Sequence, residues 1–464
     1  MNPYLPLYEY IPDGEPRVFG DRIYIYGSHD KSHGTDFCQN NYVCWSAPCG
    51  DITQWRCEGE IYKREDDADN KNGEYPLFAP DCVQGPDGRY YLYYAPGGME
   101  DTEKWYIAVA VSSTPAGKFQ YYGRIDLTAW SDRYFAFDPG VLVDEDGRVY
   151  LYYGFGMCDS LSGKRGNGGA VAELAADMIT VKKAPVPTVA NVYTNHEKDF
   201  MGHAFFEASS IRKIADKYYL IYSSEQMHEL CYAVSDAPMG KFAYKGVLIS
   251  NADLGYEGNC MPKNWYGNNH GSLACVRGEY YIFYHRHTQS SSYSRQACCE
   301  KINLLENGAF LQAECTSQGM CGHGLPAEGS YSATIAANLY NIVGTSFNND
   351  CLLHGGACFY EEGEETAAEQ YIKNFTATAK AIYKYFRFQG KTKVTITVRG
   401  SAEGELCIET EQCAAGIAVK LDTLEWKQIT GEVCQQEESA LSISFHGTGY
   451  LDIKDLAFIP SIGV

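Results

Sequence analysis

The sequence predicts an all-β protein in which a five-bladed β-propeller is followed by a β-sandwich of the jelly-roll kind. Three observations lead to this prediction. A short motif rich in tyrosine occurs five times, the steps between its copies are nearly equal, and the motif stops at about residue 325, where the composition of the chain changes. A unit of this length holds about four short strands, so five units predict five blades around one axis.

The repeated motif is a run of aromatic and aliphatic residues, which is typical of a buried strand. Its five copies are GDRIYIYGSHD (20–30), DGRYYLYYAPG (87–97), DGRVYLYYGFG (146–156), ADKYYLIYSSE (215–225) and RGEYYIFYHRH (277–287). Aligned on Tyr24, Tyr91, Tyr150, Tyr219 and Tyr281, the copies are 67, 59, 69 and 62 residues apart. Strand-like segments at 45–59, 111–123, 172–183 and 234–246 predict the outer strands of the blades. A large sandwich with evenly spaced strands is the alternative, but it does not require one motif to return five times.

A second domain begins where the repeat ends. We place the propeller at residues 1–322 and the sandwich at 328–464, after a stretch rich in Gly, Ser and Ala. Polar and apolar residues alternate in the segments 391–400, 404–411, 426–433, 440–447 and 449–459. Such alternation is typical of half-buried antiparallel strands, which predicts the sandwich.

The charge and the cysteines exclude several classes of function. The 464 residues carry a net charge of −21, and no run of Lys or Arg stands out, which argues against nucleic acid or an anionic membrane as partner. The N-terminal segment shows no basic and apolar export pattern, and no apolar stretch approaches the roughly 18 residues of a membrane span, so a cytoplasmic location is expected. The 18 Cys are scattered without a CxxC pair, which favours reduced thiols over a cysteine metal site.

One ionisable residue precedes the tyrosine motif in every unit. These residues are Asp13, Asp81, Asp138, Glu207 and His270, which lie 11, 10, 12, 12 and 11 residues before the aligned tyrosines. The innermost strands of a propeller line its channel, so the constant offset predicts that all five meet at one end of the channel. Taken singly, each aspartate could be a turn residue and His270 an ordinary core histidine.

A group of carboxyls in one cleft indicates acid and base chemistry. Like charges at close range move their pKa values apart, so that one group keeps a proton. Glu207 lies between Phe205, Phe206 and Ala208, and apolar surroundings should raise its pKa. Glycosidases need this pair of a carboxylate base and a carboxylic acid. Nearby aromatic residues, Phe37 among them, suit the faces of sugars.

The sequence resembles the family 43 glycoside hydrolases, the five-bladed propellers of the β-xylosidase and α-L-arabinofuranosidase group. The resemblance covers residues 1 to about 320 and is carried by PDGEPRVFGDRIYIYGSHD, FAPDCVQGPDGRYYLYYA, FDPGVLVDEDGRVYLYYG, FFEASSIRKIADKYYLIYS and NHGSLACVRGEYYIFYHRH with the following SRQA. It implies an inverting mechanism with Asp13 as general base, Glu207 as general acid and Asp138 as the residue that tunes and orients the acid.

The same resemblance implies further site residues. Arg295 of SRQA matches an arginine near the sugar, and Asp81 is expected to hold the terminal sugar or the loop of the base. His270 matches a channel histidine beside a central ion, often calcium, that is bound chiefly through water. The chemistry itself requires no cofactor, and a structural calcium is allowed either at His270 or in the C-terminal domain. The tail resembles a family 6-type carbohydrate-binding module, for which we favour a scaffolding role.

These expectations combine into one function with two alternatives. We expect an exo-glycosidase that releases terminal α-L-arabinofuranose from arabinoxylo-oligosaccharides, with inversion and with the Asp13 and Glu207 carboxyls roughly 6.5–9.5 Å apart. The first alternative is a β-D-xylosidase acting on xylo-oligosaccharides, since the two sugars present similar hydroxyl groups. The second, from another class, is a propeller lectin that binds sugars without cleaving them.

Overall fold

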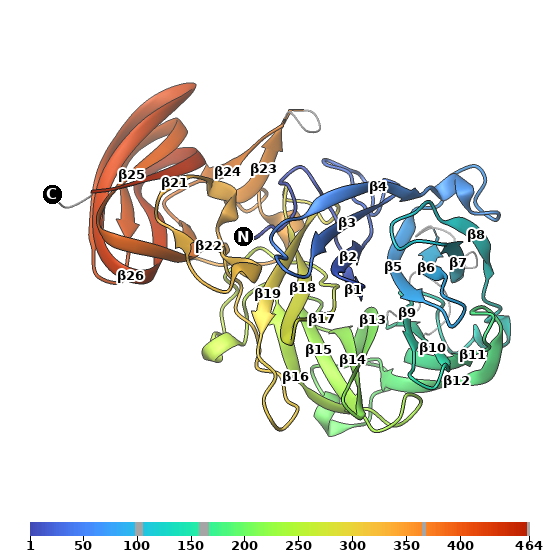
Figure 1. Ribbon diagram of the computed structural model, residues 1–464. Coiled ribbons are helices and arrows are strands. Elements are labelled where there is room, and N and C mark those ends of the chain that lie inside the picture. The colour runs from blue at the N-terminus through green and yellow to red at the C-terminus, as the bar shows by residue number, and fades with distance from the viewer. Residues whose placement is uncertain (98–104, 157–166, 364–367, 462–464) are drawn as a thin grey trace.

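The computed structural model describes residues 1–97, 105–156, 167–363 and 368–461. The chain forms a ring of five small sheets, with a larger sheet domain at its C-terminal end that adjoins the first and last blades (Figure 1). The predicted all-β class, the five-bladed propeller and the separate C-terminal β domain are confirmed. Among the described residues, no helix has the length and apolar character needed to cross a membrane.

Each blade is an antiparallel meander whose strands follow the order of the chain. Blade 1 has β1 (Glu15–Phe19), β2 (Arg22–Tyr26), β3 (Tyr42–Pro48) and β4 (Arg56–Tyr62), and blade 2 has β5 (Leu77–Gln84), β6 (Tyr90–Pro96), β7 (Ala108–Ser112) and β8 (Gln120–Arg124). Blade 3 has β9 (Gly140–Val143), β10 (Val149–Phe155), β11 (Gly168–Leu174) and β12 (Val181–Ala190), and blade 4 has β13 (Phe205–Ile214), β14 (Lys217–Ser224), β15 (Glu229–Ser235) and β16 (Ala243–Ser250). Blade 5 has three strands, β17 (Leu273–Val276), β18 (Glu279–His287) and β19 (Arg295–Ile302). The tyrosine motif forms the second strand of every blade.

The second strand is rich in large residues on both faces because each face packs against a different neighbour. In β6, Tyr91 and Tyr93 join a core cluster with Leu151 of blade 3, whereas Leu92 and Tyr94 join a cluster with Tyr26 of blade 1. A strand buried on both faces needs apolar bulk at every position, not at every second one. The repeated runs of tyrosine, leucine and isoleucine are therefore the packing between blades.

The tyrosine hydroxyls add a second contact between blades. Four of them donate to a backbone carbonyl in an outer turn of the next blade: Tyr26 to Pro115, Tyr93 to Met178, Tyr152 to Pro238 and Tyr219 to Gly308, at 2.6, 2.6, 2.7 and 2.9 Å. A buried hydroxyl without a partner is costly, so the turn of the next blade has to lie at a fixed place. This contact explains why the motif uses tyrosine where phenylalanine would give similar apolar bulk.

The C-terminal domain is built around two long, bent strands. Its strands are β20 (Leu325–Pro326), β21 (Gly329–Ser332), β22 (Asn338–Asn341), β23 (Cys358–Glu362), β24 (Glu369–Phe375), β25 (Ala379–Glu409) and β26 (Ala414–Pro460). Val394 of β25 pairs with both Gly431 and Phe458, so β26 folds back and flanks β25 on two sides. Val394, Ile396 and Val398 are buried in one core, as their alternation with polar residues predicts.

Short 3₁₀ helices occur in the connections: η1 (Arg64–Asp66), η3 (Thr128–Trp130), η4 (Lys198–Phe200), η5 (Tyr256–Gly258), η6 (Gly319–Cys321), η7 (Ala333–Ile335) and η8 (Asn348–Asp350). The last of these belongs to the sequence of the C-terminal domain but lies against the propeller. There the Asn348 side chain donates to the carbonyls of Thr288 and Ser291, and the Asn348 N–H donates to the carbonyl of Tyr266.

Buried polar contacts join the two domains. Lys384 of β25 lies 2.9 Å from both Asp253 and Glu314. The Tyr10 hydroxyl of the propeller donates to Glu361 of β23 at 2.8 Å. Breaking a buried ion pair of this kind is strongly unfavourable, so the two domains have a fixed relation to each other.

The contact made by the tyrosine hydroxyls can be tested with two matched substitutions. Tyr93→Phe should lower the free energy of unfolding by about 1 kcal/mol or more, because it removes a hydrogen bond and leaves the Met178 carbonyl unpaired. Tyr153→Phe is the control: the Tyr153 hydroxyl is buried without a hydrogen-bond partner among the described residues, so its removal should be neutral or stabilising. Urea unfolding midpoints measure both, and equal effects of the two substitutions would contradict our account of the tyrosine motif.

Candidate active site

A pocket of about 430 Å³ lies at the end of the propeller where the first strands of the blades begin. It is lined by Asp13, Phe37, Phe78, Phe137, Asp138, Phe155, Phe206, Glu207, Met227, Gly267, Asn268, His270, Ser292, Arg295, Phe347, Asn349 and Asp350. The pocket thus brings together six of the seven residues that the sequence singled out.

The three carboxyls that enter the pocket come from equivalent places in blades 1, 3 and 4. Asp13 and Asp138 stand shortly before β1 and β9 with left-handed backbones, φ 58° and 46°. Glu207 lies in β13 at an irregularity in its pairing with β14, next to Ala208 with φ 68°. Left-handed backbone is uncommon outside glycine and is often found at functional sites.

Blade 2 departs from this pattern, and Asp81 lies elsewhere. Its left-handed residue is Ala79, with φ 33°, so no carboxyl enters the pocket from this position. Asp81 sits two residues further along β5, outside the pocket lining. There Asp81 Oδ1 accepts a hydrogen bond from Arg17 Nε at 2.8 Å, and Asp81 Oδ2 accepts one from the Val141 N–H at 2.7 Å. The structure therefore places Asp81 in the support of the site.

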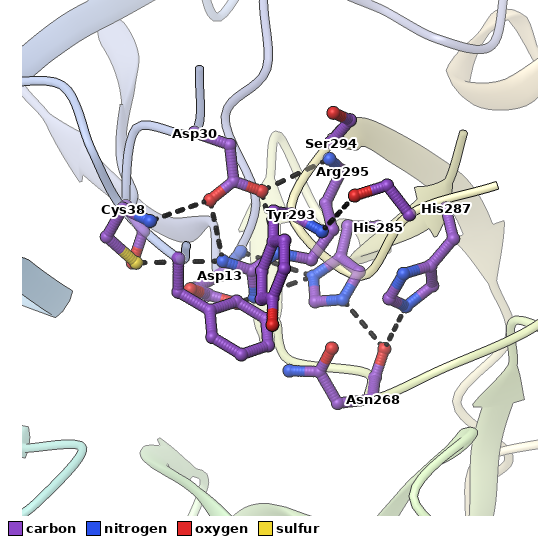
Figure 2. A network of polar contacts seen from close by, with 12 residues as sticks. Asp13, Asp30, Cys38, Asn268, His285, His287, Tyr293, Ser294 and Arg295 are labelled. Atoms are coloured by element: carbon purple, nitrogen blue, oxygen red, sulfur yellow. Dashed lines mark hydrogen bonds and ion pairs between the residues drawn. The ribbon is translucent and has the colours of Figure 1, made fainter. Parts of the chain in front are cut away.

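Asp13 is held by a buried arginine that is shared with another aspartate (Figure 2). Arg295 Nη1 donates to Asp13 Oδ1 at 3.0 Å, and Arg295 Nε and Nη2 donate to the two oxygens of Asp30 at 2.8 and 2.9 Å. All three residues are buried. Phe37 covers the guanidinium, with its ring centroid 4.9 Å from Cζ. The two bonds to Asp30 fix the orientation of the guanidinium, whose Nη1 then holds Asp13.

Two further histidines, His285 and His287 of β18, hold the loop that faces Glu207. The Nε2 atoms of both lie 2.8 Å from the Asn268 carbonyl oxygen (Figure 2). The Asp13 N–H donates to His285 Nδ1, which requires the neutral form of His285 with its proton on Nε2. Burial lowers the pKa of His285 well below its usual value, in agreement with this form.

Asn268 in turn contacts the carboxyl of Glu207. Its side-chain amide donates to Glu207 Oε1 at 3.3 Å. Sequence reasoning missed Asn268, His285, His287 and Asp30. The two histidines could have been found from their spacing. They lie two residues apart in the strand motif of the fifth unit, which predicts that both point to one face of the strand.

Burial gives the carboxyls of the pocket unusual acidities. Burial raises the pKa of Glu207 to about 7, with the Asp13 charge adding to the effect and the Asn268 amide opposing it. Burial, and then the charges of Glu207 and Asp13, raise the pKa of Asp138 well above its usual value. Asp138 Oδ2 accepts from the N–H of Ala208, which directly follows Glu207, at 2.8 Å. At neutral pH the pair of Glu207 and Asp138 therefore keeps at least one proton in the pocket.

His270 lies between the aspartates but does not form a calcium shell with them. Its Nδ1 is 3.4 Å from Asp138 Oδ2, and burial lowers the pKa of the ring to about 4, which leaves it neutral. Calcium takes six to eight oxygen ligands. Two carboxylates on neighbouring strands, Glu15 and Asp81, are already bound by Arg212 and Arg17. These side chains are therefore not free to bind calcium directly; the predicted ion beside His270, bound chiefly through water, stays a prediction.

Aromatic rings form one wall of the pocket. Phe78, Phe137, Phe155 and Phe206 make a continuous series, with successive ring centroids 5.7, 5.1 and 5.4 Å apart. They come from blades 2, 3 and 4. Flat apolar rings opposite a group of carboxyls suit a ligand with one apolar face and several hydroxyl groups, as a sugar has.

Part of the pocket lining comes from the C-terminal domain. Phe347, Asn349 and Asp350 line the pocket, and the ring of Phe347 lies 5.0 Å from that of Tyr266 in the propeller. Sequence reasoning missed these three residues, and no local pattern marks them, because only the packing of the two domains brings them to the site.

The chain is similar to proteins of known activity. The family model described as Glycosyl hydrolases family 43 matches residues 10–310. The Xylosidase/arabinosidase of Thermoclostridium stercorarium is 43% identical over 478 aligned residues, which cover 98% of either chain. The Beta-xylosidase of Xylanibacter ruminicola is 28% identical over 60% of this chain and 88% of its own length.

Two solved structures are similar in fold. A β-xylosidase/α-arabinofuranosidase from a compost metagenome, in complex with xylotriose, is 25% identical, covers 68% of this chain and 97% of its own, and has a TM-score of 0.54. The arabinoxylan arabinofuranohydrolase of Bacillus subtilis, in complex with cellotetraose, is 19% identical, covers 99% and 97%, and has a TM-score of 0.53. The second likeness extends over both domains. The matched family model ends before the C-terminal domain, whose kinship with family 6 modules stays a prediction.

The contact between Asn268 and Glu207 predicts a measurable shift in acidity. The Asn268 amide stabilises the charged carboxylate, so Asn268→Ala should raise the pKa of Glu207 above about 7. Carbon-13 NMR titration of protein labelled at glutamate carboxyls measures it, with the resonance assigned by its loss in Glu207→Gln. Asn72→Ala, which removes an amide bound to the exposed Glu74, is the control and should leave Glu207 unchanged. A Glu207 pKa that stays the same or falls in Asn268→Ala would contradict the arrangement.

Proposed function

The chain belongs to the glycosyl hydrolases family 43 and is thus a glycoside hydrolase; from this premise we propose that it is an inverting exo-glycosidase that releases terminal α-L-arabinofuranose from arabinoxylo-oligosaccharides. The observation that carries the proposal is the pocket in which Asp13, Asp138 and Glu207 meet in different environments. Asp13 is bound by a buried cation, whereas Glu207 has only an amide as its described hydrogen-bond partner. These are the conditions of a base and an acid.

In the proposed reaction, Glu207 protonates the leaving oxygen of the glycosidic bond. Its pKa of about 7 leaves a large fraction protonated at neutral pH, and this is close to the best value for proton transfer there. Asp13 takes a proton from a water that attacks the anomeric carbon from the other side. Asp138, which accepts a hydrogen bond from the N–H that follows Glu207, is assigned to orienting the acid and tuning its pKa.

The remaining pocket residues are assigned to the sugar. Arg295 holds Asp13, and Phe37 covers the guanidinium of Arg295. Arg295 and Phe37 together thus set the position of the base relative to the sugar ring. His270, neutral and beside Asp138, offers a hydrogen bond to a hydroxyl group. The phenylalanine wall supports the apolar face of the sugar. Asp81 acts from outside the pocket, because it binds Arg17 and the start of β9.

The choice of arabinofuranose rests on the names of the relatives. Relatives are named Xylosidase/arabinosidase and Arabinoxylan arabinofuranohydrolase, and similar solved structures hold xylose or xylotriose. The C-terminal domain adds Phe347, Asn349 and Asp350 to the lining of the pocket, and the proposed exo-action on a terminal sugar is left to the experiment. Hydrolysis of β-D-xylosides is the second candidate, carried by the relatives named Beta-xylosidase. A lectin would not need a separate acid and base.

The roles of Asp13 and Glu207 predict different responses to the leaving group. Asp13→Ala should lower kcat on every substrate by about 10³-fold, because attack by water always needs the base. Glu207→Gln should lower kcat by a similar factor on oligosaccharides, but much less on aryl glycosides whose leaving group needs no proton. Steady-state kinetics on both substrate types measure this.

The pH profile separates these roles further. In the wild type, kcat should fall as the pH rises through about 7, because Glu207 loses its proton. With an aryl glycoside, Glu207→Gln should lose the alkaline limb. An alkaline limb near 7 that persists in Glu207→Gln, or equal mild losses in both variants, would refute the assigned roles.

The sugar and the stereochemistry can be tested together. Paired aryl α-L-arabinofuranoside and aryl β-D-xylopyranoside should both be hydrolysed, the first with the higher kcat/KM. Proton NMR during the first turnovers should show β-L-arabinofuranose before mutarotation, since inversion changes the anomeric configuration. Binding of arabinoxylo-oligosaccharides without turnover of either substrate would favour the lectin, and α-L-arabinofuranose as first product would refute inversion.

A further inference from the structure

A second cluster of reactive side chains lies in blade 4, outside the pocket. It consists of His203, which precedes β13, and of Glu229 and Cys231, which are two residues apart on β15 and so point to the same face of that strand. The proposed mechanism uses none of the three. Among the residues that the structure describes, no other group of His, Cys, Asp and Glu side chains gathers its potential metal-ligand atoms this closely.

The distances within the cluster are close to those of a metal site. His203 Nδ1 is 2.6 Å from Glu229 Oε1, Cys231 Sγ is 3.4 Å from the same oxygen, and Cys231 Sγ is 3.8 Å from His203 Nδ1. Zinc bonded to nitrogen, oxygen and sulfur at tetrahedral angles would hold these atoms roughly 3.4–3.6 Å apart. Only the contact between His203 and Glu229 has to widen, by less than about 1 Å on that geometry.

The surroundings hold two ligands in place and leave the third reachable. Glu229 and Cys231 are buried, whereas the His203 side chain is 31% exposed, which gives an ion a way in. Ser224 Oγ donates to Glu229 Oε1, and Tyr244 stacks on the His203 ring at 4.8 Å. Outer contacts of this kind orient the ligands of metal sites.

We propose that His203 Nδ1, the Glu229 carboxylate and the Cys231 thiolate bind one divalent cation of the zinc type. A set of one nitrogen, one oxygen and one sulfur suits a borderline-soft ion such as zinc and not calcium or magnesium. The fourth position falls on the exposed side and takes a water. Binding replaces the hydrogen bond between His203 and Glu229 and releases the thiol proton of Cys231, and any proton shared by the other two, to solvent.

The place of this site gives it a consequence for the fold. His203 lies four residues before Glu207, at the entry to the strand that carries the proposed acid. An ion shared by His203 and β15 would fix that entry independently of the ladder between β13 and β14, which is irregular at Glu207. The site would act as a clamp on blade 4.

Metal binding to the full chain tests the proposal. Zinc titration by calorimetry should give one strong equivalent, and cobalt(II) should produce a thiolate-to-cobalt charge-transfer band in the near ultraviolet. Cys231→Ser should abolish the band, and Cys231→Ser and His203→Gln should each weaken binding by about 100-fold or more. Cys434→Ser, which removes an exposed thiol of β26, is the control and should change neither. Saturating zinc should raise the Tm of the wild type and of Cys434→Ser but of neither site variant.

Cys231 is buried, so Cys231→Ser could fail to fold. His203 is partly exposed, so His203→Gln should still fold, which circular dichroism can check, and this variant keeps the proposal testable. Lack of one strong equivalent in the wild type would overturn the proposal, and the cluster would then be an ion pair beside a core thiol. A cobalt band of full strength in Cys231→Ser would also overturn it. Both readouts are independent of hydrolysis, so they stand whatever sugar the enzyme cleaves.

Discussion

The burial of each second strand between two neighbouring blades is the constraint on which the rest of the structure depends. It fills both faces of the strand with large residues, and the tyrosine hydroxyls reach the outer turns of the next blade. Rotation of one blade relative to the next would unpack a core and leave hydroxyls unpaired. The first strands are thereby held at fixed angles around one axis. Residues far apart in sequence, such as Asp13 and Arg295, can then meet in one pocket within hydrogen-bonding distance of each other.

That rigidity supports an unfavourable arrangement of charge. Three buried carboxyls lie in one pocket, and burial together with the charge of neighbouring carboxyls raises the pKa of Glu207 and of Asp138. One cation, Arg295, is divided between Asp13 and Asp30, and no cation is bound to Glu207 among the described residues. The carboxyls of one pocket therefore lie in different electrostatic surroundings. A looser scaffold would relax by admitting water or separating the carboxyls, and the difference between acid and base would disappear.

The sequence predicted the features that repeat and missed those that depend on packing. The tyrosine motif predicted five blades, and its offset brought Asp13, Asp138, Glu207 and His270 to one place. It failed for Asp81, because blade 2 has Ala79 at the left-handed position and its acid two residues deeper in the strand. His285 and His287 were missed because they belong to the tyrosine motif of the fifth unit, which was interpreted only as a buried strand. Phe347, Asn349 and Asp350 come from another domain, and no period or spacing relates them to the propeller. Alternation predicted the C-terminal strands but not which family of modules they resemble.

The rim that η8 supplies also bears on how such chains evolve. A domain attached by a linker can be lost or exchanged while the activity of its neighbour persists. Here the appended sheet contributes part of the wall of the cavity, and Asn348 is bound to backbone carbonyls of the propeller. In this chain the two parts are therefore joined at the site itself, so a change in either part can alter the wall of the cavity. Substitutions at Phe347, Asn349 or Asp350 would thus reshape the cavity from a domain outside the repeated blades.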